Sequence, residues 1–227
     1  MKKLGIVLAL VGVLLVIALA VGWYLDGKAR ALAEAEAEKR VLEALPGTRS
    51  AKVEIEGFPF LFDVLVSGEI DRLHVVLQDV ASPGIVVESI ELTVDRLKID
   101  SDLLIGEQKL AITGIGRAEV VGRITAEAAS AALKQRVEFD GDTVRVEVAG
   151  TKAAAKVAIA GRKIAVDVDT SQMPAQYAHY APRYVVPLPP VDVLPCEPGL
   201  AVKRSRLELR CSITELPPSV KKAIGQR

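Results

Sequence analysis

Only two histidines are present, and neither has the neighbours that a metal site or an acid–base site requires. His74 lies in a segment of alternating apolar and polar residues, on the side opposite Leu73 and Val75, which indicates a surface position. His179 lies between two tyrosines in a proline-rich segment. It is a candidate for lining a site, but a structural role is favoured because no partner ligand is visible.

Motifs for catalysis or cofactor binding are also missing from the sequence. It has no HExxH, CxxC or GxSxG and no phosphate-binding loop, and Gly114-Ile115-Gly116 lacks the third glycine of a dinucleotide fingerprint. The carboxylates alternate with apolar residues, as on a solvated sheet face, and no pair stands out as a glycosidase-type acid and base. We therefore expect no catalytic residue, metal or cofactor, and a protein that is not an enzyme.

The N-terminus carries the chemistry of a membrane segment. Lys2 and Lys3 precede an uncharged apolar run over 4–25, which as a helix spans about 33 Å at roughly 1.5 Å per residue, the thickness of a bilayer core. Basic residues favour the cytoplasmic side, so the rest of the chain is expected outside the cytoplasm. Trp23 and Tyr24 then fall at the level of the outer headgroups.

A cleaved signal peptide is the alternative for residues 1–25. Ala18-Leu19-Ala20 has the small-x-small form of a cleavage site, and the stretch before it has the character of an apolar signal core. The apolar run continues to Leu25, which favours an uncleaved single-pass anchor. Both alternatives place the remainder of the chain in an extracytoplasmic compartment, on the cell membrane or released from it.

The two cysteines, Cys196 and Cys211, agree with export. On an exported chain, two cysteines this close in sequence favour a disulfide over half of a metal site. A disulfide closing a loop of that length would contribute about 3 kcal/mol in the chain-entropy model. Neither cysteine lies near the N-terminus, which excludes a lipid-modified cysteine anchor.

Composition and periodicity favour one domain of α+β class after the anchor. Twenty-nine basic residues balance 29 acidic ones, and no basic stripe interleaves with aromatics, so nucleic-acid binding has no support. Residues 26–45 read as a helix that Pro46-Gly47 ends, either a stalk over 26–47 or the first helix of the domain. Thr125 is the expected N-cap of a helix over 126–135. The rest, 48–227, shows mainly antiparallel strands, with regular alternation around 53–55, 73–77, 90–94, 144–148, 157–159, 164–168 and 207–213.

One dense apolar run, Gly57-Phe58-Pro59-Phe60-Leu61-Phe62-Asp63-Val64-Leu65-Val66-Ser67-Gly68, holds three of the four phenylalanines. It is either an ordinary core element or an apolar wall that accepts acyl chains, since ligand pockets are mainly apolar with few polar groups. The candidate lipid-binding residues are Phe58, Phe60, Leu61, Phe62 and Leu65.

At this run the sequence resembles the LmeA-like family of actinobacterial envelope proteins. The resemblance rests on VEIEGFPFLFDVLVSGEIDRLHVVLQDV at residues 53–80, on VVGRITAEAASAAL at 120–133, and on the C-terminal stretch 187–218 with its paired cysteines and terminal Leu-Pro-Pro. Together these stretches cover most of residues 50–218, and an N-terminal hydrophobic segment is also usual in the family.

The resemblance implies a phospholipid- or glycolipid-binding protein that supports envelope lipid or lipoglycan assembly or transport. It also implies a tubular lipid-binding fold, in which a highly curved antiparallel sheet wraps around a helix. No catalytic residue carries over. Two alternatives stay open: a scaffold or interaction domain for a membrane enzyme, and an envelope hydrolase acting on lipid or glycan.

Overall fold

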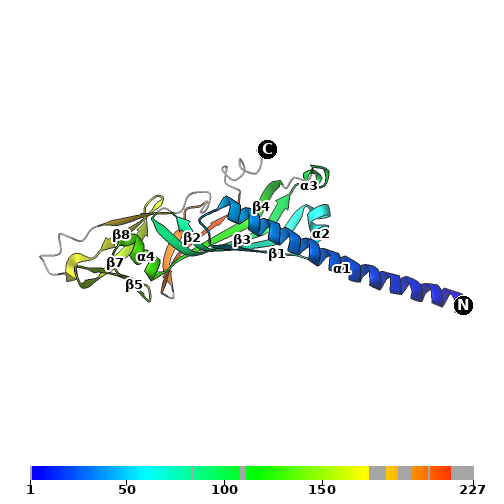
Figure 1. Ribbon diagram of the computed structural model, residues 1–227, viewed down its shortest axis with the longest axis horizontal. Helices are drawn as coiled ribbons and strands as arrows, with labels where there is room; N and C mark the ends of the chain where they lie inside the picture. The colour runs from blue at the N-terminus through cyan, green and yellow to red at the C-terminus, as the bar shows by residue number, and fades with distance from the viewer. Residues whose placement is uncertain are drawn as a thin grey trace.

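A computed structural model describes residues 2–82, 84–107, 111–173, 183–188, 196–203 and 205–215, with the side chains of 2–20 and Gln172 outside the description. Helix α1 runs from Lys2 to Ala44, and its N-terminal half projects beyond the rest of the molecule (Figure 1). Most of the predicted membrane segment, residues 1–20, and His179 therefore lie outside the described side chains. Among the helices whose side chains are described, none has an apolar stretch long enough to cross a membrane.

A six-stranded antiparallel sheet forms the larger part of the fold. Its strands lie in the order β1 (Ser50–Glu56), β2 (Glu69–Ser82), β3 (Ile85–Ile99), β4 (Ile112–Ile124), β11 (Arg206–Ile213) and β10 (Gly199–Lys203). Short helical segments connect some of them: α2 (Phe60–Phe62), the π-helical turn η1 (Asp63–Ser67) and α3 (Ser101–Glu107). A further helix, α4 (Ala126–Leu133), follows β4 and leads to the second sheet. The predicted N-cap is confirmed, because the Thr125 hydroxyl accepts a hydrogen bond of 3.1 Å from the Ala128 N–H.

The second sheet is a five-stranded antiparallel meander at the opposite end of the molecule from α2 and α3 (Figure 1). Its strands are β5 (Val137–Asp140), β6 (Thr143–Val148), β7 (Thr151–Ile159), β8 (Lys163–Val168) and β9 (Tyr184–Pro187), and the 3₁₀ turn η2 (Thr170–Gln172) follows β8. Strand β9, which lies within the proline-rich part of the sequence, pairs with β8. Both sheets are open in the described part, so the fold is α+β and dominated by antiparallel strands. A sheet wrapped around a helix remains a prediction.

Two residues with positive φ interrupt the alternation of the long central strands. Asp79 has φ 51° in β2 and Arg96 has φ 52° in β3. The buried positions of β2 step from Leu77 to Val80, three residues rather than two, across the first of these. Such a step lets one strand keep apolar side chains on a single side while it twists along its length. Beside Arg96 the sheet favours a glycine, since a Cβ on Gly116 would lie 3.1 Å from both the Arg96 Cβ and the Asp95 carbonyl oxygen.

Candidate functional site

One face of the six-stranded sheet is apolar from edge to edge. Residues directly opposite one another on neighbouring strands share a face, and the register sets Val75 opposite Leu92, Leu92 opposite Val120, and Val120 opposite Cys211. Parallel rows continue the pattern. We call this surface the apolar face: Val53, Ile55, Leu73, Val75, Leu77, Ile90, Leu92, Val94, Ala118, Val120, Leu200, Val202, Leu207, Leu209, Cys211 and Ile213.

The apolar face is only partly covered by the described chain. Members such as Val75, Val120 and Leu209 are buried, whereas others keep part of their surface open: Leu73, Leu92, Leu200, Val202 and Ile213. Partly open apolar side chains that are continuous with a packed core are the usual lining of sites for apolar ligands.

The opposite face of the same sheet carries cross-strand ion pairs. The Arg123 guanidinium donates hydrogen bonds to both carboxylate oxygens of Glu91, and its Nε lies 3.5 Å from a carboxylate oxygen of Glu208. The hydrogen bond from Arg123, helped by its charge, lowers the pKa of Glu91 below the ordinary value of a glutamic acid. His74 lies on this face 3.0 Å from the Thr93 hydroxyl, which confirms its predicted position away from the apolar side. The two faces thus differ in chemistry, and only the apolar one suits acyl chains.

A ladder of four polar side chains fastens helix α1 to the free edge of the sheet. Strand β1 is an edge strand, and its outward N–H groups at Ile55 and Val53 donate to the carboxylates of Glu34 at 2.8 Å and Glu38 at 3.0 Å. Arg30 lies one turn before Glu34 and donates a hydrogen bond to the Gly57 carbonyl. The buried Asp26 lies one turn before Arg30 and accepts a hydrogen bond of 2.7 Å from the Leu61 N–H. The residues of this ladder, Asp26, Arg30, Glu34 and Glu38, recur every four positions and so share one side of the helix.

Beside the polar ladder, α1 carries an apolar stripe at the same spacing. Its side chains pack against the hydrophobic core, and three of the five are alanines: Ala29, Ala33, Ala37, Val41 and Leu45. Alanine holds the helix close to the strands, because it has no side chain beyond Cβ. Residues 26–45 therefore lie along the β1 edge of the sheet (Figure 1). The repeat of four was readable in the sequence, but its role as a cap on a sheet edge was missed.

The five candidate residues of the phenylalanine run do not form one wall. Phe60 is buried in the core, and Leu61 is partly buried against it. Phe58, Phe62 and Leu65 are exposed, with Phe58 stacked at an angle on Trp23 at 6.0 Å between ring centroids. The run therefore both anchors one end of the sheet and presents aromatic and aliphatic groups outward. Their contact with lipid remains a prediction.

Carboxylates crowd the start of this run. Gly57 has φ 128°, which favours glycine, and a Cβ there would lie close to two carboxylates, 3.2 Å from an Asp63 oxygen and 3.3 Å from an Asp71 oxygen. Burial, followed by the charges of Asp71 and Asp26, raises the pKa of Asp63 above its ordinary value. Among the described residues, no group of three or more His, Cys, Asp or Glu side chains has the arrangement to hold a metal ion.

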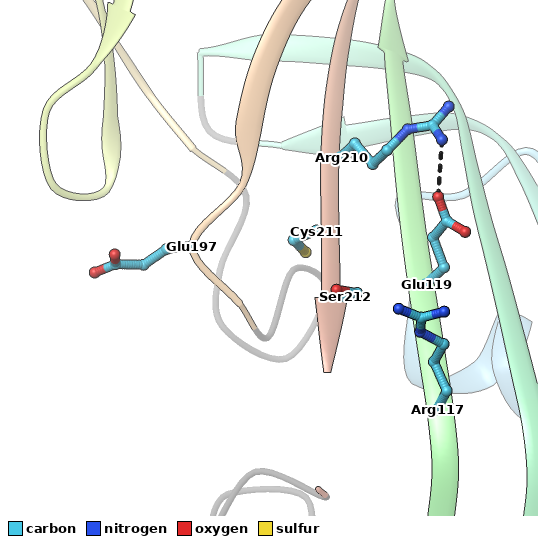
Figure 2. Close-up of a pocket in the computed structure, with 6 residues that line it drawn as sticks. All are labelled: Arg117, Glu119, Glu197, Arg210, Cys211 and Ser212. Atoms are coloured by element: carbon cyan, nitrogen blue, oxygen red, sulfur yellow. Dashed lines mark hydrogen bonds and ion pairs between the residues drawn. The ribbon is translucent and has the colours of Figure 1, made fainter. Parts of the chain in front are cut away.

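A surface hollow of about 450 Å³ lies beside β4 and β11 (Figure 2). Its lining is mainly ionic, and Arg210 in it is already paired with Glu119 at 3.0 Å and with Glu208 at 3.8 Å. This ionic lining suits an acyl chain less well than the apolar face does.

A disulfide joins Cys196 to Cys211, whose Cα atoms are 6.0 Å apart. Cys211 is buried on the apolar face, so the bond fixes the segment before β10 against the C-terminal half of β11.

The sequence model of the LmeA-like phospholipid-binding family matches residues 25–204. The chain belongs to this family. The match begins at Leu25, just before the polar ladder of α1, and ends after β10, so it includes the phenylalanine run and the apolar-face residues of every strand except β11. The resemblance noted at 53–80 is thereby confirmed, and the family's description is one of lipid binding rather than catalysis. No curated protein and no solved structure matches the chain.

Proposed function

We propose that this chain is an extracytoplasmic phospholipid-binding protein that supports the assembly or transport of envelope lipids or lipoglycans. The observation that carries the proposal is the apolar face, which crosses six strands and stays partly open at residues such as Leu73 and Leu92. Family membership supplies the class of ligand. The ion-paired opposite face would stay in water.

Acyl chains are the part of the ligand that the apolar face would hold. Each methylene moved from water into apolar surroundings contributes about 0.8 kcal/mol, so a few methylenes in contact with the face are enough for reversible binding. The head group would remain at the border of the face, where charged side chains lie. Helix α1 would form one border, because its polar ladder fixes it along the β1 edge.

The N-terminal run would determine where the domain works. Lys2 and Lys3 followed by an apolar run over 4–25 support a single-pass anchor with the domain outside the cytoplasm. Uncleaved, this anchor would keep the domain beside the membrane that supplies its lipid. Cleaved after Ala20, it would release a shuttle.

Native mass spectrometry of the full chain, purified in a detergent without added lipid, tests the proposal. We expect co-purified phospholipid and uptake of labelled phospholipid from liposomes. Leu92→Asn, on the apolar face, should lower the bound fraction several-fold, whereas Thr93→Asn places the same amide on the opposite face and should leave it unchanged. Absence of both co-purified lipid and uptake in the unmodified chain would refute the proposed function.

A further inference from the structure

Exposed apolar side chains gather at one end of the molecule. In the described part of the chain, twelve large apolar side chains are exposed, and nine of them come from three short segments. We call these nine the apolar tip: Val21, Trp23, Tyr24, Leu25, Phe58, Phe62, Leu65, Val66 and Ile105. Exposed apolar clusters of this kind mark binding surfaces on soluble domains.

The three segments adjoin in space although they lie far apart in sequence. Helix α1 contacts α2, and α3 contacts η1, while the ring contact between Trp23 and Phe58 joins α1 directly to the phenylalanine run. In Figure 1, α2 and α3 lie at the end of the six-stranded sheet from which the N-terminal half of α1 projects. The tip therefore surrounds the point at which α1 leaves the domain.

The phenylalanine run is apolar on both of its sides. Phe60 and Val64, one turn apart, are buried in the core, while Phe62, Leu65 and Val66 are exposed at 54, 42 and 66 %. Core packing explains only the first pair. A helical segment that is hydrophobic all round needs a second apolar environment on its outer side.

We propose that the apolar tip docks into the boundary between head groups and acyl chains of a lipid bilayer; this inference rests on the membrane placement proposed above. The helix α1 is continuous from Lys2 to Ala44, so the apolar run over 4–25 ends at the tip and would meet the bilayer at the same level. Trp23 and Tyr24 are residue types that favour this boundary. Lys28 follows one turn later on the side of the domain, and its ammonium lies 5.7 Å from the centroid of the Tyr24 ring. A lysine at this position can keep its charge in the water beside the head groups.

Docking at this end would open the apolar face towards the bilayer. The rows of the face continue to the tip through Ile70, Leu97 and Ile115, which lie opposite one another on β2, β3 and β4. Phe60 and Val64 belong to the same hydrophobic core. An acyl chain leaving the bilayer at the tip would thus meet apolar side chains along its whole path.

Site-directed labelling of the full chain tests this docking, because both native cysteines are in the disulfide and an added one is the single free thiol. Nitroxides are attached at Phe62→Cys, Val66→Cys and Ile105→Cys, with Val86→Cys and Val185→Cys as controls of similar exposure elsewhere. The protein is reconstituted in phosphatidylcholine–phosphatidylglycerol vesicles. Collision with oxygen and with a nickel chelate is then compared by power saturation.

The tip labels should lie about 5–10 Å inside the head-group boundary, protected from the nickel chelate, while both controls remain fully accessible to it. Tip labels as accessible to nickel as the controls would overturn the proposal. The proposed function is scored separately by the lipid that co-purifies with the unlabelled chain. If lipid co-purifies but the tip labels are exposed to water, only the docking proposal is rejected. If the tip labels insert into the bilayer but no lipid co-purifies, only the proposed binding function is rejected.

Discussion

Removing the carboxylates that cap the edge of β1 should loosen helix α1 from the sheet. Glu34 and Glu38 accept hydrogen bonds from the backbone N–H groups of Ile55 and Val53, at 2.8 and 3.0 Å. Glu34→Ala and Glu38→Ala delete these acceptors while keeping a good helix former at each position. In the described part of the chain, no other strand lies on this edge to take their place.

The expected loss follows from the chemistry of the two bonds. A hydrogen bond to a charged acceptor contributes about 1.5–3 kcal/mol, and the lower end applies here because both carboxylates are only partly buried. Each alanine variant should therefore lower the free energy of unfolding by about 1.5 kcal/mol. Glu34→Gln should lose less, since its amide oxygen still accepts a hydrogen bond.

Urea unfolding in detergent micelles and hydrogen exchange of the Ile55 and Val53 amides measure the effect. Glu36→Ala is the matched control, because Glu36 is exposed and pairs with Arg40 on the same helix rather than with the sheet; it should leave the free energy of unfolding nearly unchanged. The reasoning is refuted if Glu34→Ala and Glu38→Ala cost no more than the control, or if the two amides keep their protection.

Three further predictions concern charge and cross-linking. Burial raises the pKa of Asp63 in the folded protein, so the ionisation of Asp63 weakens the fold as the pH rises through this raised pKa. Asp63→Asn should therefore raise the urea midpoint at pH 7 and leave the midpoint unchanged at pH 3. Because Arg123 lowers the pKa of Glu91, the ion pair stabilises the fold fully above the ordinary glutamate pKa, and this stabilisation is lost as the pH falls through the lowered pKa of Glu91. Arg123→Gln should therefore make the free energy of unfolding depend less on pH in urea titrations from pH 6 to 3. Replacing both Cys196 and Cys211 by serine should cost about 3 kcal/mol of unfolding free energy, also by urea titration.

The strands of the sheets were largely predictable from sequence. Leu73, Val75 and Leu77 alternate with polar residues because one side of β2 is apolar and the other ion-paired, and period-two alternation reports that difference directly. The meander from β6 to β8 was readable for the same reason. The strand order was not predictable, because no local sequence pattern shows that β11 lies between β4 and β10.

The candidate site was only partly predictable. Composition identified the phenylalanine run as a candidate. Which of its phenylalanines are buried, as Phe60 is, or exposed, as Phe62 is, depends on the orientation of a short helical turn that the sequence pattern does not predict. The apolar face escaped notice because it is assembled from six strands, each contributing two to four ordinary residues. The positive φ of Asp79 and Arg96, which lets the long strands twist, also leaves no clear trace in residue type.

The central claim is that acyl chains lie on the apolar face, and photo-crosslinking tests it most directly. A phospholipid with a diazirine in its acyl chain is incubated with the full chain in vesicles, irradiated, and its adducts are mapped by peptide mass spectrometry. We predict adducts at partly open positions of the apolar face, namely Leu73, Leu92 and Ile213. Adducts confined to the ion-paired face around Glu119 and Arg210, or absent from the sheet altogether, would contradict it.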